Sequence, residues 1–363
     1  MEQAARVVQY YDSGRWSAVP ANNGGNGPTW QWGEEILTGF TVGTYELRSK
    51  GHQTTNQMPF ASWLARSLDG GESWNTWVPK NYAGHPWDLQ AIPRSVDFSS
   101  TGFVMRVEGA GYHGNDGARW FLSENRGSSW LGPFGFGGLL QHPELADKEF
   151  TGRTAYIVNG RKELYTFLSV RDQTDGGPSA IRLAEKTFMA KTTDGGANFT
   201  FVSWIVPWRD PSRAVMPAPV RCPGSELVVT LRRKSETNNW IDCYGSMDDG
   251  ATWQFRSMVG YTEDGNRYNG NPPAMVRLAD DRLCCVYGNR SDLQILCRFS
   301  SDRGGTWSEP RVLRDDFQSV NRWPDLGYCR LFQRPDGLCV TNYFWCTPER
   351  PQTHIEVSIF DPA

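Results

Sequence analysis

The chain has 363 residues, of which 39% are hydrophobic and 21% charged, a composition that suits a folded core and excludes an intrinsically disordered chain. Lysine and arginine total 37 against 40 aspartates and glutamates, and the net charge of −3 excludes the strongly basic surface typical of nucleic-acid-binding proteins. No stretch approaches the roughly 18 consecutive apolar residues of a membrane-spanning helix.

Glycine and tryptophan stand out in this composition. The chain holds 38 Gly and 16 Trp, a combination typical of short strands, tight turns and aromatic packing. In chain order, the first predicted strand covers residues 6–11 (RVVQYY). The start of the chain, MEQAAR, lacks the apolar segment of a secretory signal peptide. We therefore expect a cytoplasmic protein, with a mature secreted chain as the alternative.

An eight-residue pattern recurs five times along the chain, and each copy predicts a hairpin turn. Its aspartate or asparagine can cap backbone N–H groups, its glycine can adopt a positive φ, and its closing aromatic residue begins the returning strand. The copies are residues 67–74 (SLDGGESW), 123–130 (SENRGSSW), 192–199 (TTDGGANF), 246–253 (SMDDGATW) and 300–307 (SSDRGGTW). Their spacing indicates a fold built from repeated units.

Three predicted strands precede each of the last two turns: 215–221, 226–232 and 240–245 before the fourth, then 273–278, 283–288 and 295–299 before the fifth. With one strand after the turn, each unit has four strands in about 54 residues, the size of a propeller blade. Three strands end the chain (326–333, 338–345 and 354–360), and residues 6–11 can supply their missing fourth. We predict an all-β, helix-free fold: a six-bladed β-propeller of four-stranded antiparallel blades. It forms a single domain over residues 1–363, and the N-terminal strand completes the last blade.

Cysteine is confined to the last part of the chain. No two cysteines are spaced as CxxC, and several lie in apolar strand-like runs such as 283–287 (LCCVY). We interpret them as buried thiols in a reducing compartment, with metal or redox use as the alternative. The eight are Cys222, Cys243, Cys284, Cys285, Cys297, Cys329, Cys339 and Cys346.

The repeated turn, written S-x-D-x-G-x-[ST]-W, resembles the Asp-box, or BNR repeat, of the sialidase (neuraminidase) superfamily. The resemblance covers nearly the whole chain. It implies a six-bladed propeller and the activity of an exo-α-sialidase, which is a glycoside hydrolase. Because such turns also occur in unrelated propellers, they specify the fold better than the activity. We therefore interpret their five Asp and Asn side chains as framework.

The topology of a four-stranded blade separates these turns from an active site. The turns join the third and fourth strands, so the loops between second and third strands lie at the opposite end, with the connections between blades. All five histidines fall in these other loops: His52, His85, His113, His142 and His354. Longer loops gathered at one end are the usual place for a binding site.

The sialidase resemblance implies an arginine triad for the substrate carboxylate, a tyrosine nucleophile assisted by a glutamate, and an aspartate as acid/base. Arg232, which ends VVTLR, resembles the blade-4 arginine, with the adjacent Arg233 as the alternative. Arg290, in YGNR, resembles the blade-5 arginine, and Tyr328, in GYCRL, resembles the tyrosine that opens blade 6. Guanidinium groups suit a carboxylate because each can donate two parallel charge-assisted hydrogen bonds.

Three positions depart from the family pattern. Where Arg-Ile-Pro is expected at the opening of blade 1, residues 26–30 read NGPTW. Residues 41–66 contain no aspartate to act as acid/base, only Glu46 and His52. The segment 215–220 (VMPAPV), where the assisting glutamate is expected, has no acidic residue.

Other residues at the same end can take over the missing roles. We expect Arg153 or Arg213 to replace the missing arginine, and Asn269 and Asn271 to bind hydroxyl groups. His52 can transfer protons near neutral pH, and we take it as the substitute acid/base.

His113 lies in the loop 111–117 (GYHGNDG) and is a further candidate for substrate contact. A solvated or structural histidine is the alternative for both His52 and His113. Trp30 and Trp32 are candidates for stacking on a sugar, with core packing as the alternative. The expected catalytic residues are Tyr328 and His52, and the expected substrate-binding residues are Arg232, Arg290, Arg153, Arg213, Asn271 and His113.

These residues predict an exo-acting glycoside hydrolase of sialidase type that releases a terminal carboxylated sugar, either sialic acid or a related nonulosonic acid. A retaining and an inverting route both stay open. The alternatives are a polysaccharide lyase or uronate-directed glycosidase on the same fold, and a non-catalytic carbohydrate-binding propeller.

The expected partner is a glycan or oligosaccharide with a carboxylate, and neither nucleic acid nor a membrane is expected. The chain is expected to be a monomer or a simple homo-oligomer. It has no P-loop, no G-x-G-x-x-G after a strand and no His/Cys cluster with zinc spacing. We therefore expect no cofactor and no metal.

Overall fold

The computed structural model describes residues 6–11, 16–19, 29–51, 53, 61–80, 88–108, 118–151, 155–172, 184–265 and 267–363. Within these residues it has 25 strands and one short 3₁₀ helix, η1 (Gly137–Gln141). The described residues include no helix that is long and apolar enough to cross a membrane.

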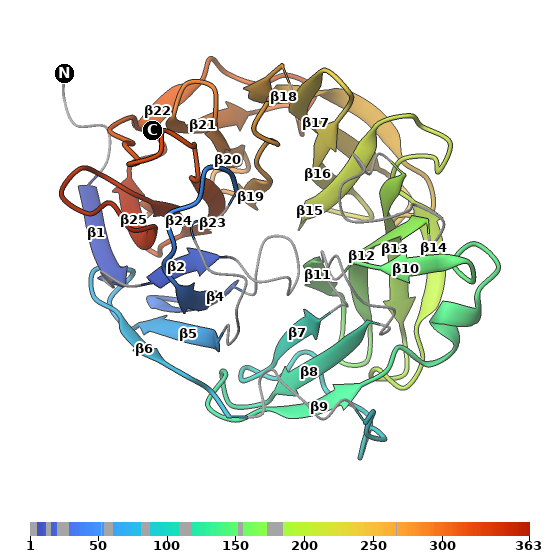
Figure 1. Ribbon diagram of the computed structural model, residues 1–363. Helices are drawn as coiled ribbons and strands as arrows, with labels where there is room; N and C mark the ends of the chain where they lie inside the picture. Colours follow the sequence, from blue (N-terminus) through green and yellow to red (C-terminus); the bar gives the residue numbers. More distant parts are fainter. Residues whose placement is uncertain are drawn as a thin grey trace.

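The sheets stand in a ring around a common centre, and the chain passes through them in sequence order (Figure 1). The first sheet holds β2 (Trp16–Val19), β3 (Thr29–Trp32), β4 (Glu35–Thr44), β5 (Ala61–Ser67) and β6 (Asn75–Trp77). The second holds β7 (Val104–Glu108), β8 (Arg119–Ser123) and β9 (Leu131–Phe134).

The next sheet has nine strands in two antiparallel groups. One group is β10 (Lys148–Phe150), β11 (Ala155–Val158), β12 (Leu164–Asp172), β13 (Glu185–Thr192) and β14 (Thr200–Trp204). The other is β15 (Arg213–Arg221), β16 (Leu227–Lys234), β17 (Asn238–Ser246) and β18 (Gln254–Asp264). A single parallel pairing, Lys186 with Ala214, joins the two groups.

The last two sheets complete the ring. One holds β19 (Pro273–Arg277), β20 (Leu283–Asn289), β21 (Gln294–Ser300) and β22 (Arg311–Arg314). The other holds β23 (Gly327–Gln333), β24 (Cys339–Trp345), β25 (His354–Phe360) and the N-terminal β1 (Arg6–Tyr11). β1 pairs antiparallel with β25, so the first strand of the chain lies in the same sheet as the last three, as the sequence predicts.

Each repeated turn is held by the same set of side-chain hydrogen bonds. In the fourth copy the Ser246 hydroxyl accepts the N–H of Gly250 at 2.8 Å and donates to Asp248 at 2.7 Å. Asp248 in turn accepts the N–H of Thr252 at 2.9 Å. Asn125, in the second copy, accepts the N–H of Ser129 at the same distance of 2.9 Å. The polar side chains therefore cap the turn locally, and they are framework rather than site.

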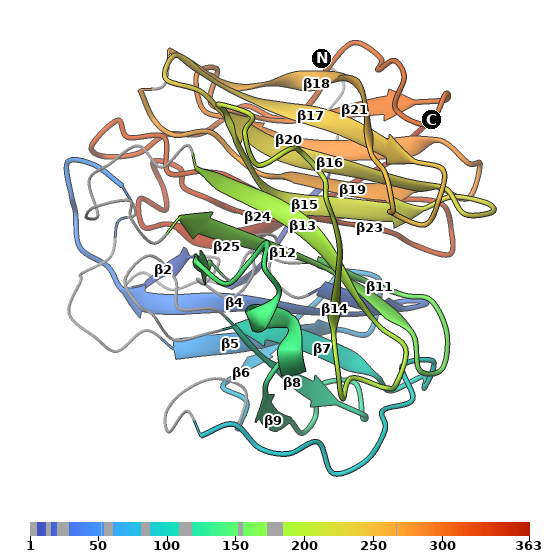
Figure 2. The same cartoon turned by 90° about the vertical axis from the view of Figure 1, so that its right-hand side faces the viewer.

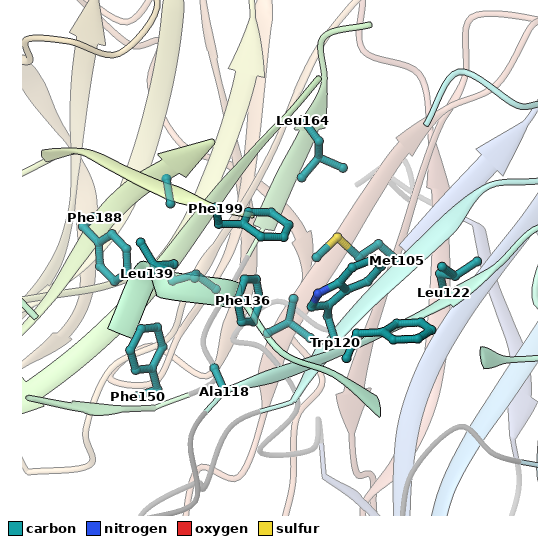
Figure 3. Close-up of a cluster of buried hydrophobic side chains, with 14 of the residues drawn as sticks. Met105, Ala118, Trp120, Leu122, Phe136, Leu139, Phe150, Leu164, Phe188 and Phe199 are labelled. Atoms are coloured by element: carbon teal, nitrogen blue, oxygen red, sulfur yellow. The ribbon is translucent and has the colours of Figure 1, made fainter. Parts of the chain in front are cut away.

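Aromatic side chains fill the space between neighbouring sheets. Figure 3 shows Trp120, Phe136 and Phe199 gathered in the largest apolar cluster, which strands from two sheets and η1 surround. The Phe136 and Phe199 rings are 4.8 Å apart at an interplanar angle of 67°, and Trp120 and Phe199 are 6.1 Å apart at 72°. These edge-on contacts explain part of the aromatic composition as packing between repeated units.

Candidate functional site

The candidate site lies on the face of the ring opposite the repeated turns. The strands run between these two ends, as the side view shows (Figure 2). Ser246 and Ser300, which open two of the turns, pair with Leu227 and Leu283, the first residues of β16 and β20. The far ends of β16 and β20 therefore lie at the opposite end of the ring, where Arg232 is located.

Two strands next to the centre of the ring carry a bulge at the same place. The pairing of β23 with β24 jumps from Gly327–Phe344 to Arg330–Asn342, and Tyr328 inside the jump has a φ of 55°. β15 has the same irregularity, and there Met216 has a φ of 59°. A non-glycine residue with positive φ is uncommon in a strand, and a bulge re-aims the side chain that it carries.

Arg232 and Arg290 converge on one residue, Asn269. The Arg232 Nη2 donates to Asn269 Oδ1 at 2.8 Å, and the Lys234 Nζ donates to the same oxygen at 3.0 Å. The Arg290 Nη1 donates to the backbone carbonyls of Asn269 at 2.6 Å and Tyr268 at 3.0 Å. The sequence predicts Arg232 and Arg290 only on separate strands. In the structure, cations from β16 and from the end of β20 lie within hydrogen-bonding distance of one residue, Asn269.

The charge of Arg290 is poorly compensated. Arg290 is only 5% exposed, and its Nε has no hydrogen-bond partner among the described residues. Its hydrogen-bond partners are backbone carbonyl oxygens, and none of the carboxylates among the described residues lies within ion-pair distance of it. A buried cation is unfavourable unless an anion compensates it, so Arg290, with only carbonyl partners among the described residues, is suited to an incoming anion.

Asn271 connects this network to Tyr328. Its residue is fully buried, and its Oδ1 accepts the backbone N–H of Tyr328 at 3.2 Å. The ring of Tyr328 is half-buried and packs against Phe344 with 5.5 Å between the centroids. The Arg330 guanidinium donates to the Tyr328 carbonyl. The candidate group thus consists of two hydrogen-bonded sets, Arg232 and Arg290 on Asn269 and the Tyr328 backbone on Asn271, and the two asparagines are two residues apart in one segment.

Glu263 supports this group and was missed by the sequence reasoning. It is fully buried at the end of β18, where its carboxylate accepts the Asn239 side-chain amide at 2.5 Å and the N–H of Tyr268 at 2.9 Å. It also accepts the N–H of Arg267. Glu263 thereby fixes the segment whose carbonyls bind Arg290. The family pattern predicts an acid at 215–220, on the strand nearest the centre, whereas Glu263 lies on the outermost strand of its group.

Arg213 lies beside the group but has a different partner. Its guanidinium forms an ion pair with Glu185, and both residues are buried. Lys186, next in the chain, donates from Nζ to the Ser212 carbonyl at 2.7 Å. Burial lowers the pKa of Lys186 to about 8. The structure therefore does not bring the Arg213 side chain into the Asn269 network.

Arg233, the alternative to Arg232, points to the other face of β16. Its guanidinium contacts the carboxylates of Asp210 at 2.8 Å and Asp242 at 3.4 Å, and the Tyr244 hydroxyl at 3.2 Å. Successive side chains of a strand alternate between faces, which separates the two arginines. Arg232 is thus the one of the two that reaches Asn269.

Several expected residues cannot be placed in the site. His52, His113 and Arg153 lie outside the described residues. Trp30 is buried against Trp130 at 5.8 Å and donates to the Tyr156 hydroxyl at 2.6 Å, so it packs in the core. In the part of the chain that the structure describes, no three His, Cys, Asp or Glu side chains are arranged to hold a metal ion.

Comparison with known proteins gives the fold. No protein-family model and no curated protein matches the sequence. A Dyadobacter fermentans protein of unknown function has a similar structure, with a TM-score of 0.69 and 17% identity over 98% of both chains. A Penicillium chrysogenum α-L-arabinanase bound to arabinobiose gives 0.61 and 14% over 98% of both chains. The fold is a β-propeller.

A sialidase is also among these structures. The Trypanosoma rangeli enzyme in complex with sialic acid gives a TM-score of 0.54 at 12% identity, over 98% of this chain and 58% of the sialidase. At such identities the likeness concerns the propeller alone. The chemistry of this chain has to be argued from its own residues.

Proposed function

We propose that this protein is an exo-acting glycoside hydrolase that releases a terminal carboxylated sugar, either sialic acid or a related nonulosonic acid, from glycoconjugates. The observation that carries the proposal is the convergence of Arg232 and Arg290 on Asn269, two residues before Asn271, which accepts the backbone N–H of Tyr328. Several similar propellers are named as glycosidases, an arabinanase and a sialidase among them, which supports a glycosidase on this fold.

The proposed architecture is a six-bladed propeller forming a single domain over residues 1–363. The two antiparallel groups of the nine-stranded sheet count as two blades, because only one parallel pairing joins them. With the other four sheets this gives six. The repeated turns, interpreted as Asp-boxes, lie between the last two strands of five of these groups.

In the proposed reaction Arg232 and Arg290 bind the sugar carboxylate, and Tyr328 stabilises or attacks the oxocarbenium-like centre. His52 serves as the proposed acid/base, and Arg153 and His113 are proposed substrate contacts. Residues 215–220 contain no glutamate to assist the tyrosine. We therefore propose two routes, a retaining one and an inverting one in which an activated water attacks the sugar.

A substrate panel tests the proposal. Purified full-length protein is incubated with α-sialosides, uronate-terminated oligosaccharides and arabino-oligosaccharides, and the released sugars are identified by mass spectrometry. Release of a nonulosonic acid is the expected result. Release of arabinose alone, or no release from any substrate, contradicts it. An unsaturated uronate product would instead indicate the alternative, a lyase. The absence of an acidic residue in 215–220 favours this alternative.

Two variants then assign the roles. Tyr328→Phe is expected to lower kcat by on the order of 100-fold or more, because it removes the reacting hydroxyl. Arg290→Met is expected to raise KM about 10- to 100-fold by removing charge-assisted hydrogen bonds to the carboxylate. Tyr261→Phe, which alters an exposed tyrosine on β18, is the matched control and should leave both constants unchanged.

A further inference from the structure

The backbone N–H of Tyr328 does not join the ladder between β23 and β24, because it falls inside the bulge. Its hydrogen-bond partner is the Oδ1 of Asn271 at 3.2 Å, from the segment that leads into β19. We infer that Asn271 is a positioning residue, whose side chain holds Tyr328 in its left-handed bulge and so fixes where the phenol lies. The effect on catalysis rests on the proposed function, whereas the effect on the tyrosine does not.

Two glycines fit closely against the Asn271 carboxamide. A Cβ on Gly327 would lie 2.4 Å from Asn271 Oδ1, and a Cβ on Gly288 would lie 2.8 Å from Asn271 Nδ2. Real side chains do not approach so closely, so only glycine suits either position without displacing the carboxamide. Gly327 also has a φ of 104°, which further favours glycine. Backbone from β20 and from β23 therefore encloses the carboxamide on two sides.

This enclosure argues against a direct substrate contact for Asn271. The residue has no exposed surface, and its Oδ1 is already engaged by Tyr328. Its Nδ2 is buried beside Gly288 without a partner among the described residues. A buried donor without a partner costs free energy. We therefore attribute the role of this carboxamide to the hydrogen bond that its oxygen accepts from Tyr328.

The strain at Tyr328 gives that contact its importance. A non-glycine residue in the left-handed region costs roughly 1–3 kcal/mol and persists only where its surroundings hold it. Among the described residues, Asn271 contacts the N–H of Tyr328, Arg330 its carbonyl and Phe344 its ring. The contact from Asn271 comes from the segment before β19, so it ties the tyrosine backbone to the segment that also carries Asn269.

Fluorine NMR tests the positioning without any substrate. In protein labelled with 3-fluorotyrosine, the resonance of Tyr328 is identified by its absence in Tyr328→Phe. Asn271→Ala removes the acceptor and should shift or broaden this resonance while leaving the other tyrosines unchanged. Asn271→Asp keeps an oxygen in place and should leave the resonance closer to its original position.

A second variant reaches the same contact from the other side and covers the case in which Asn271→Ala does not fold. Gly288→Ala should displace the carboxamide and shift the Tyr328 resonance in the same way. Gly160→Ala is its control, because Gly160, like Gly288, has no positive φ, and a Cβ there would meet its nearest atom, the Cβ of Glu163, at 3.8 Å. A Tyr328 resonance that stays unchanged in Gly288→Ala and in the folded Asn271 variants overturns the inference, whatever the activity.

Activity, once found, separates positioning from substrate binding. Asn271→Ala should lower kcat about 10-fold or more with KM little changed, because displacing a reacting group slows the chemical step. Asn271→Asp should recover part of kcat. A raised KM with an unmoved Tyr328 resonance would make Asn271 a substrate contact and contradict the positioning role.

Discussion

At the scale of single residues, neighbouring charged side chains differ sharply in their partners. Arg232 reaches Asn269, whereas Arg233, one residue later, contacts Asp210 and Asp242. Alternation along β16 accounts for the difference, because the two side chains leave the sheet on opposite faces. The same strand thus contributes one cation to the candidate site and one to a buried ion-pair cluster beside it.

The buried pair of Glu185 and Arg213 lies near this cluster, since both act on the pKa of Lys186, and breaking the pair should be costly. Glu185→Gln leaves the buried Arg213 guanidinium without its carboxylate, and we expect the free energy of unfolding to fall by about 3–5 kcal/mol. Glu124→Gln removes one partner of the exposed pair with Arg94 and should cost no more than about 1 kcal/mol. Urea denaturation of both variants measures the difference, and equal losses would contradict a structural role for the buried pair.

The residues of the site were predictable only where a local pattern marks them. Arg232, Arg290, Asn271 and Tyr328 each lie in or beside a recognisable strand, and the structure links the two arginines to Asn269 and the Tyr328 backbone to Asn271. Glu263 has no such mark. Its importance comes from hydrogen bonds with Asn239 on the neighbouring strand and with the turn that follows β18. Such contacts depend on the fold and cannot be recognised in a single sequence.

At the scale of elements, the repeated turn does more than reverse the chain. One glycine of each of these turns, with a positive φ, packs against the preceding sheet or strand group: a Cβ would lie 2.4 Å from the Cys243 Sγ at Gly304 and 2.1 Å from the Met189 Sδ at Gly250. In the first copy, a Cβ at Gly71 would lie 2.9 Å from Val340 of the last sheet. These turns therefore contact the strands of the preceding sheet or group, and the first sheet contacts the last.

Glycine variants separate this contact from backbone strain. Gly304→Ala adds a methyl group at a φ of 86° and against Cys243, so we expect a loss of about 2–5 kcal/mol, from roughly 1–2 for the conformation and 1–3 for overpacking. Gly337→Ala imposes a similar φ of 92° where a Cβ meets nothing within 4 Å. It should lose only the conformational part. Thermal or urea unfolding of both variants measures the difference, and equal losses would show that the contact between sheets contributes nothing.

Turn chemistry also explains why the strands were predictable. Asp, Gly and aromatic residues act within eight residues, so the repeat is visible in the sequence, and strands such as 6–11 and 354–360 are found as predicted. The second sheet shows the limit, because its described residues form three strands rather than four. The joining of β13 to β15 at one parallel pairing also has no local signal, since it depends on how two sheets meet.

At the scale of the whole molecule, the thiols concentrate in the later sheets. All eight cysteines are free and buried, and they lie in or beside the sheets formed by residues 213–363. Burial raises the pKa of Cys243, Cys297 and Cys329 to about 12. It raises the pKa of Cys222, Cys284, Cys285 and Cys346 as well. These side chains act as apolar packing atoms, in agreement with the interpretation made from the sequence.

This distribution predicts a loss of stability in alkaline solution. A thiol whose pKa is raised by folding contributes fully below its unfolded pKa of about 8.5, and the contribution disappears as the pH rises toward the folded value. Lys186 acts in the opposite direction, because its lowered pKa makes stability rise with pH above about 8, but it is one group against seven. Between about pH 7.5 and pH 9.5 each thiol should therefore cost about 1 kcal/mol.

Urea denaturation with a reductant at these two pH values measures the loss, and the free energy of unfolding should fall by several kcal/mol. Cys297→Ala removes one titrating thiol, so its loss between the two pH values should be smaller than that of the wild type by about 1 kcal/mol. Thr252→Ala, which alters an exposed turn and no thiol, is the control and should keep the full difference. A free energy of unfolding that does not change between the two pH values would mean that the thiols ionise in the folded protein, and hence that water reaches the interior of these sheets.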